Sequence, residues 1–190
     1  IDYTYEMPSE RLVNQQLIDL SVNTDEVVFD YDTLKSKVKK LIKGIDIKFN
    51  TEFDGDISDC DYLINATYAN MNKVNEILGV PTIKLKLQDV AVPHFKMDSE
   101  PFGLTIMDGP FCSIMPKGNN PNEFLLYSVK HSLVKDNKLD IDTIYKNSEK
   151  YLPFLKNVEK IGYWRTTRAL PINDNDERLS EIFTYENHPK

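Results

Sequence analysis

Glycine is scarce in this sequence. Seven glycines in 190 residues are about half the usual frequency. Neither G-x-G-x-x-G nor G-x-x-x-x-G-K-[ST] occurs anywhere, and these are the motifs that hold phosphates against a helix N-terminus. The sequence therefore lacks a recognisable nucleotide-binding loop of its own.

Cysteines and long apolar runs are also few. Cys60 and Cys112 are the two cysteines, too few for a disulfide framework, and they form no C-x-x-C motif. They fit reduced thiols in a cytoplasmic protein. No apolar run is long enough to span a membrane, and no signal-peptide pattern opens the sequence. We therefore expect a cytoplasmic location and no membrane partner.

Clustered positive charge is lacking as well. The net charge is -7, with 28% charged and 41% hydrophobic residues, which is an ordinary globular composition. Nucleic acids and anionic membranes both select for clustered lysine and arginine, so we expect a small-molecule substrate and no nucleic acid. The length suits a single domain over residues 1–190. Nothing in the sequence indicates an oligomeric state.

Residues 103–132 carry the clearest structural pattern, a meander of three strands. Asp108-Gly109 is a tight-turn dipeptide, Pro110 suits a strand start or edge, and residues 118–122 form the second turn. Between the turns the side chains alternate, so that Cys112 and Ile114 face away from three others, Phe111, Ser113 and Met115. One sheet is thus predicted at the centre of the chain.

The remaining pattern predicts helices and further strands around this sheet. Helices are expected over residues 8–20, 33–43 with Asp32 as cap, 72–78, and from Asp140 through Leu155, with Pro153 kinking or ending the last one. Strands are expected over residues 26–29, 45–49, 62–66, 83–87, 160–170 and 181–185. The fold class is therefore α+β, with a mixed, largely antiparallel β-sheet and helices packed on one side.

Two polar features favour structural roles. Residues 54–61 are rich in aspartate but lack the twelve-residue calcium-loop spacing and its closing glutamate, so a polar turn is the better interpretation. His94 stands between Pro93 and Phe95 without a companion His or Cys at ligand spacing. We predict a structural role for His94 and no metal site.

Three blocks of the sequence resemble a known family. The first is MDGPF followed by S-x-MP and a Leu-Tyr-Ser-Val-x-His strand, and the others are residues 61–72 and 150–178. Together they resemble bacterial FAD-dependent oxidoreductases related to the D-amino-acid oxidase class. The resemblance implies a fold like the substrate domain of a two-dinucleotide-binding-type flavoprotein, with residues 45–67 returning to the FAD-binding part.

The resemblance also implies where the nucleotide-binding segment lies. In this family the dinucleotide fingerprint comes before the point at which this sequence begins. We therefore expect the chain to be the middle, substrate-domain portion of a longer flavoenzyme. FAD is then the expected cofactor of the complete protein, and this chain alone is not expected to bind it tightly or to be catalytically competent.

Candidate site residues follow from this resemblance and from the chemistry of flavin oxidases. Residues near the cofactor are expected in two places, at Thr67 and Tyr68, where Tyr68 replaces the usual glycine, and at Asp108, Gly109 and Pro110. Hydride chemistry belongs to the flavin, so the protein orients substrate and excludes water, and no catalytic residue is assigned. The substrate-binding candidates are Tyr127, His131, Trp164, Arg165 and Arg168.

The two arginines have a specific expected role. Arg165 or Arg168 could clamp a substrate carboxylate through two parallel hydrogen bonds. The alternative for each is a surface ion pair. Thr67 likewise has an alternative, in which Asn65 of the same segment simply satisfies neighbouring backbone groups.

Two functions remain open at this point. The first is the substrate-binding portion of an FAD-dependent oxidoreductase that oxidises an amine or hydroxyl-bearing small molecule. The second is a non-enzymatic binding or interaction module that kept the flavoenzyme scaffold and lost FAD, because a fold alone does not secure catalysis.

Overall fold

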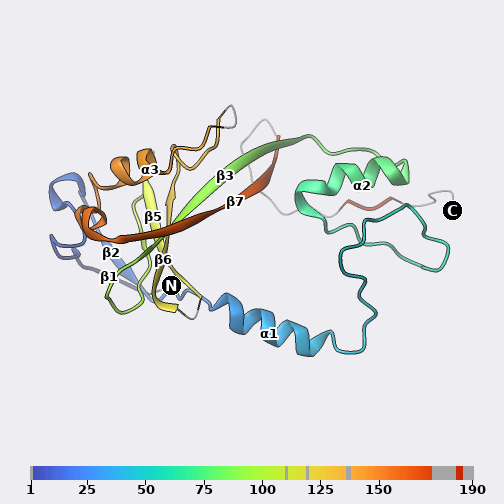
Figure 1. Ribbon diagram of the computed structural model, residues 1–190, viewed down its shortest axis with the longest axis horizontal. Helices are drawn as coiled ribbons and strands as arrows, with labels where there is room; N and C mark the ends of the chain where they lie inside the picture. Colours follow the sequence, from blue (N-terminus) through green and yellow to red (C-terminus); the bar gives the residue numbers. More distant parts are fainter. Residues whose placement is uncertain (1, 110, 119, 136–137, 173–182, 186–190) are drawn as a thin grey trace. The chain divides into compact units, whose positions relative to one another are not determined.

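The structure is a computed structural model that describes residues 2–109, 111–118, 120–135, 138–172 and 183–185 (Figure 1). The fold class is α+β, as predicted. The helical elements are α1 (Tyr31–Leu41), α2 (Met71–Leu78), α3 (Ile141–Ser148) and the short 3₁₀ turns η1 (Gln15–Leu17), η2 (Tyr68–Asn70) and η3 (Pro153–Asn157). The strands are β1 (Tyr3–Tyr5), β2 (Val22–Thr24), β3 (Leu85–Lys96), β4 (Leu104–Thr105), β5 (Cys112–Lys117), β6 (Asn120–Ser128) and β7 (Glu159–Pro171).

Contacts divide the chain into two compact units. The first unit comprises residues 1–44 and 90–166, and the second comprises residues 45–89 and 167–190. The long strands β3 and β7 contribute residues to both. The predicted strand at 181–185 and the loop that follows Pro171 fall largely outside the described residues.

The predicted meander is present in the first unit. The five-stranded antiparallel sheet has the order β4-β5-β6-β3-β7, and β1 pairs with β2 in a separate two-stranded sheet. Cys112 and Ile114 are buried while Met115 is exposed, which confirms the predicted alternation. The first turn is longer than a tight dipeptide turn, because the Ile106 amide donates to the Cys112 carbonyl at 3.0 Å and closes a wider loop.

The main core of the first unit lies on one face of this sheet. Phe95 and Phe124 are paired across β3 and β6, and their rings stack with centroids 5.5 Å apart. Against this face pack α3 and the turn that follows it, through Ile144, Tyr145 and Leu155, all fully buried. The Asp140 side chain caps α3 by accepting from the Thr143 amide at 2.9 Å.

Helix α3 is shorter than predicted. It ends at Ser148, and the apolar residues Leu152 and Leu155 belong to the following turn and η3. Pro153 lies beyond that end, at the first position of η3, where a helical turn needs no backbone N–H. The apolar spacing was thus correctly assigned to the core but wrongly to a single helix.

The N-terminal part of the first unit corrects three further predictions. Residues 8–20 contain only η1 in place of a helix, and residues 26–29 form no strand. Helix α1 is capped by Asp30 and not by Asp32, because the Asp30 carboxylate accepts from the Asp32 and Thr33 amides at 3.1 Å each. No residue of α1 is buried.

The second unit is built around α2. The helix ends at Gly79, whose φ of 68° is the left-handed conformation that glycine tolerates. Its first turn is tied to the start of the next segment, because the Asn72 side chain accepts from the Ile83 amide and donates to the Ile83 carbonyl, both at 2.8 Å. Asn75 adds a bond to the Pro81 carbonyl.

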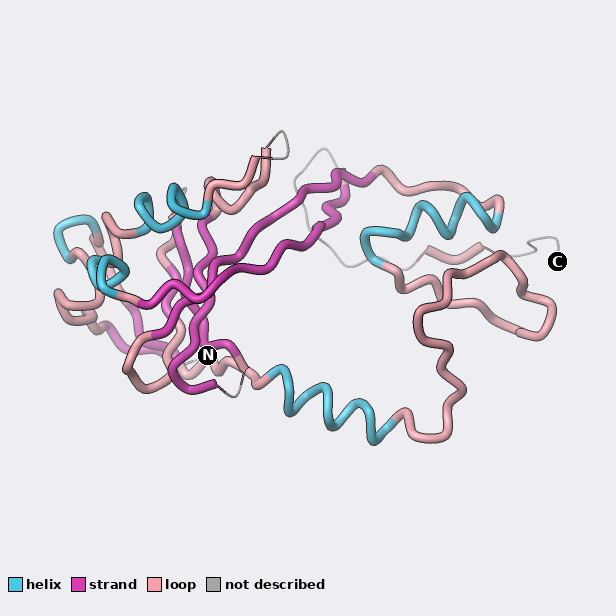
Figure 2. The backbone as a smooth tube through the Cα atoms, viewed as in Figure 1, coloured by secondary structure: helices cyan, strands magenta, loops and turns pink. Residues whose placement is uncertain are grey.

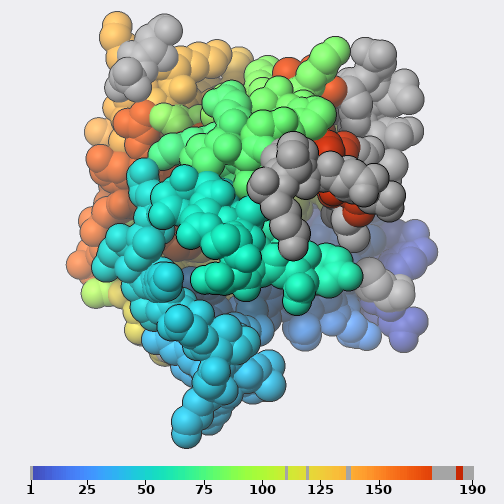
Figure 3. Space-filling model, turned by 90° about the vertical axis from the view of Figure 1, so that its right-hand side faces the viewer, coloured from blue at the N-terminus to red at the C-terminus, as the bar shows by residue number. Residues whose placement is uncertain are grey.

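The predicted strands at 45–49 and 62–66 are wrong. Both segments are loops (Figure 2), and part of this region lies at the molecular surface, coloured cyan in Figure 3. Phe49, Tyr62 and Ile64 are largely exposed. A strand needs a neighbour that accepts its backbone hydrogen bonds, and the described residues provide none for these two segments.

Candidate functional site

The candidate site is the face of the five-stranded sheet that points away from α3. Side chains of paired residues in antiparallel strands lie on the same face. The register pairs His94 with Leu125, Leu125 with Met115, and Tyr127 with Ser113. These side chains therefore line a face separate from the Phe95–Phe124 core, and we call it the open face.

His94 and Trp164 meet on the open face. Their rings contact edge to face, with centroids 5.0 Å apart and an interplanar angle of 78°. The imidazole is buried, and its Nε2 has no hydrogen-bond partner among the described residues. The indole is about half exposed (48%), so Trp164 is the solvent-facing member of the pair.

The backbone at His94 is held from the opposite side of the sheet. The buried Tyr145 hydroxyl of α3 donates to the His94 carbonyl at 3.1 Å. Burial and the nearby Asp142 raise the pKa of Tyr145 to about 12, so the phenol stays protonated as a donor. The core helix thus fixes the strand that carries the imidazole.

Electrostatics keep His94 neutral. Burial lowers the pKa of His94, and the positive charge of Lys117 lowers it further, while Glu123 opposes them. The Lys117 ammonium and the Glu123 carboxylate form an ion pair at 3.1 Å, and that bond is the main reason why the pKa of Glu123 is lowered. A neutral imidazole with an unbonded ring nitrogen can serve as one hydrogen-bond donor or acceptor.

Two of the five predicted substrate residues lie on the open face. Tyr127 is half-buried there, beside Ser113, and Trp164 covers His94. Arg165 follows Trp164 on β7, and because consecutive strand side chains point to opposite faces, it lies on the other side of that strand.

The other two predicted substrate residues are placed differently. His131 lines a small pocket together with Cys112 and Ser128, whose side chains belong to the core face. Arg168 belongs to the second unit, where its Nε donates to the Gln88 Oε1 at 2.9 Å. Next to it, the Thr167 hydroxyl donates to the Asp89 carboxylate at 2.6 Å.

The residues predicted near a cofactor occupy two strained bends, one in each unit. Tyr68 has a φ of 53° and Asp108 a φ of 67°, values that side chains other than glycine adopt rarely. Thr67 donates from both its amide and its hydroxyl to Asn65 Oδ1. Asn65 also donates to the Met71 carbonyl at 3.0 Å, so it bonds neighbouring backbone groups from a loop and not from a strand.

Gly109 lies against the Phe111 ring. A Cβ atom at this position would lie 2.5 Å from the Phe111 ring, and Phe111 itself contacts the Tyr151 ring edge to face at 5.0 Å. The bend that contains Asp108 and Gly109 thus seats Phe111 against the segment after α3. Pro110 lies outside the described residues.

His94 is the site residue that the sequence did not identify. The predicted strand ended at Leu87, whereas β3 continues to Lys96. The pairing of His94 with Leu125 depends on residues far apart in the chain, and no local pattern encodes it. The nearest signal in the sequence is that two apolar residues, Pro93 and Phe95, flank His94.

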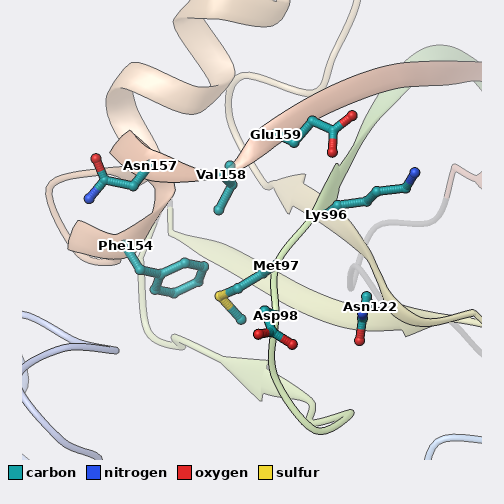
Figure 4. Close-up of a pocket in the computed structure, with 8 residues that line it drawn as sticks. All are labelled: Lys96, Met97, Asp98, Asn122, Phe154, Asn157, Val158 and Glu159. Atoms are coloured by element: carbon teal, nitrogen blue, oxygen red, sulfur yellow. The ribbon is translucent and has the colours of Figure 1, made fainter.

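A larger cavity lies at another edge of the first unit (Figure 4). Its volume is about 480 Å³, and Met97, Phe154 and Val158 point toward one another within it. These three side chains also pack against the main core. Both signs of charge line it, through Lys96, Asp98 and Glu159, and it contains none of the predicted site residues.

Two kinds of site were not found. In the described residues, no three or more His, Cys, Asp or Glu side chains come together as metal ligands. Within the same part of the chain, no helix combines the length and apolar character needed to cross a bilayer.

Comparisons with known proteins identify a fold relationship. No family model and no curated protein sequence matches the chain. Among solved structures, the crystal structure of glycine oxidase from Geobacillus kaustophilus is similar, with a TM-score of 0.50 and 13% sequence identity. The match covers 65% of this chain and 32% of that chain. The chain therefore shares the fold of about a third of that oxidase, and the relationship is distant.

Proposed function

We propose that this chain forms the substrate-binding portion of an FAD-dependent oxidoreductase that acts on an amine or hydroxyl-bearing small molecule. The observation that carries the proposal is the open face, on which His94, Tyr127 and Trp164 gather in a fold shared with part of an oxidase. The sequence blocks that resemble the D-amino-acid oxidase class point the same way.

The open face fits the ring end of a flavin and not its phosphates. Met115 and Trp164 are partly exposed and offer an apolar and aromatic surface, and the unbonded His94 Nε2 lies buried beside the indole. A phosphate-holding glycine loop does not occur in the sequence. Bound flavin would supply hydride transfer, and the residues of this chain would orient the substrate and exclude water.

The proposed roles follow from position. Trp164 is half exposed and would form the aromatic wall against which a substrate packs, and the Tyr127 hydroxyl would hydrogen-bond its polar group. His94 would orient Trp164 and accept or donate one bond once the indole moves aside. Arg165 lies on the side of β7 opposite Trp164 and is therefore not assigned to the open face. Arg168 remains a candidate for a carboxylate clamp, and Thr67, Tyr68, Asp108 and Gly109 for contacts to the cofactor.

The first test uses the protein expressed from its full reading frame. We expect the purified protein to be yellow, with the visible absorbance bands of a bound flavin, and amines or alcohols to bleach those bands under anaerobic conditions. A colourless protein to which added FAD does not bind would contradict the proposal and favour a binding module without a cofactor.

Matched aromatic variants test the open face. Tyr127→Phe removes one hydroxyl from it, and Tyr163→Phe makes the same change at an exposed residue next to Trp164 in sequence, on the opposite side of β7. We expect Tyr127→Phe to raise KM or lower kcat about tenfold, the usual effect of losing one hydrogen bond to substrate. Equal kinetics for the two variants would exclude Tyr127 from the site.

A further inference from the structure

A small pocket on the core side of the sheet has no role in the function proposed above. Its volume is about 170 Å³, well above the roughly 10–15 Å³ that one water molecule needs. Residues at the start of β5, at the end of β6 and just after it, and at the end of α3 and just after it line the pocket, among them Cys112, Ser128, Lys130, His131, Ser148 and Lys150. It is large enough for one small polar group and too small for a nucleotide.

Positive charge converges on this pocket. Lys130 and Lys150 line it together with His131, and burial and the charges of both lysines lower the pKa of His131. None of the described lining residues carries a carboxylate. In a chain with a net charge of -7, this local excess of cations requires a specific explanation, and a bound anion would stabilise it.

A buried hydroxyl in the pocket lacks a partner. Ser148 is 2% exposed, and its Oγ has no partner at full hydrogen-bond geometry among the described residues; it makes only a weak side-chain interaction with the Cys112 thiol. Burial raises the pKa of that thiol to about 11, and the interaction with Ser148 opposes the rise. Cys112 is therefore neutral and does not compete with an anion for the lysines. Buried polar groups are normally bonded, so Ser148 has a donor available for a ligand.

We propose that this pocket binds a small oxyanion of the phosphate type. The two lysines would neutralise a charge of more than one unit, and the Ser148 hydroxyl would donate to an anion oxygen. A phosphate monoester and free phosphate present the same oxygens, and the pocket volume admits either. Ser148 and Cys112 belong to the core side of the sheet, so this site is independent of the open face.

The C-terminal end of α3 offers an alternative explanation for the positive charge at the pocket, one that requires no bound anion. Lysines near a helix C-terminus interact favourably with its dipole, and α3 ends at Ser148. Lys146 shares that last turn but does not line the pocket. Lys146→Gln is therefore the matched control, because it changes the helix end and leaves the pocket intact.

The experiment measures binding of inorganic phosphate to the whole chain by calorimetry, with chloride at equal ionic strength as the reference. We expect saturable phosphate binding that is about tenfold weaker in Lys150→Gln and in Ser148→Ala, as for a lost hydrogen bond to a charged group, and unchanged in Lys146→Gln. Lys150 is exposed, so its variant serves even if the buried Ser148 variant fails to fold.

Two results would overturn the proposal. One is phosphate heat that does not differ from that of chloride, and the other is equal affinity in Lys150→Gln and Lys146→Gln. Methyl phosphate and inorganic phosphate are compared in parallel to identify the source. Tighter binding of methyl phosphate assigns a phosphate monoester, and tighter binding of the inorganic ion assigns free phosphate. Neither result depends on flavin, so the outcome is separate from that of the proposed function.

Discussion

The imidazole of His94 and the indole of Trp164 contact each other edge to face on the open face of the sheet, with ring centroids 5.0 Å apart. Trp164 is the single tryptophan of the sequence. Its fluorescence therefore reports on one imidazole, which makes the protonation state of a buried histidine directly observable.

The first prediction concerns this fluorescence. A protonated imidazole quenches a neighbouring indole, and burial lowers the pKa of His94 from its ordinary 6.5. We expect Trp164 emission to fall on acidification with a midpoint below pH 6.5. His94→Gln should abolish this step, while His131→Gln should retain it. A midpoint at or above 6.5 in the folded protein would show that the imidazole is solvated.

The first prediction extends to stability, because the same pKa shift makes the free energy of unfolding depend on pH. Because the pKa of folded His94 lies below its unfolded value, the unfolded chain binds more protons as the pH falls through and below 6.5. The contribution of this group to the free energy of unfolding is therefore lost in that direction. Urea denaturation between pH 7.5 and pH 5 should show a smaller loss for His94→Gln than for the parent protein. His131→Gln is measured alongside His94→Gln. Its loss of unfolding free energy should also be smaller than that of the parent protein, because the pKa of His131 is lowered as well.

Lys117 supplies a second prediction. Its positive charge is the second cause that lowers the pKa of His94, so Lys117→Met should move the midpoint of the Trp164 titration to higher pH. The Glu123 carboxylate then lacks its ion-pair partner and adds to the upward shift. Lys73→Met removes a lysine from an exposed ion pair in the second unit and should leave the midpoint unchanged. A titration curve that is identical in both variants would rule out the electrostatic coupling.

The third prediction concerns Gly109. In Gly109→Ala the new Cβ would approach the Phe111 ring to 2.5 Å, so the ring or the backbone has to move. Overpacking of this kind costs about 1–3 kcal/mol of unfolding free energy. Gly103→Ala is the control, because its nearest neighbour, Val28, would lie at an ordinary 3.5 Å. Chemical denaturation of both variants measures the difference, and equal stabilities would show that the bend adapts freely.

The fourth prediction separates the two cysteines. Cys60 is exposed and Cys112 is buried, with its pKa raised to about 11 by burial. Because the thiolate is the reactive form, Ellman's reagent at neutral pH should titrate one thiol in the native protein and two in denaturant. Cys60→Ser should leave no rapidly reacting thiol. Rapid reaction of two thiols under native conditions would mean that the core around Cys112 opens.

Sequence patterns correctly predicted those elements of the fold that depend on residues close together in the chain. The meander, α2 with its closing Gly79, the cap at Asp140 and most of β7 all appear where composition and spacing placed them. The segments at 45–49 and 62–66 have equally good strand patterns and are loops. A strand pattern specifies a preference, whereas forming the strand requires a partner, and for these two segments the described residues contain none.

For the candidate site, too, the sequence identified some residues and missed another. Tyr127 and Trp164 were identified from residue type and from the family resemblance. His94 was assigned a structural role, because its pairing with Leu125 and its contact with Trp164 both join distant parts of the chain. The sequence around His94 contains no signal for either contact. Only the assembled sheet brings the imidazole and the indole together.

The exposed loop at 45–49 has a practical consequence for handling the protein. Ile45, Ile47 and Phe49 lie at the surface with an alternation that suits cross-strand stacking. Such a segment is a template for aggregation when molecules crowd together. Replacing Ile47 by lysine would place a like charge on every copy and improve solubility, and it changes no residue of the open face or of the small pocket at the end of α3.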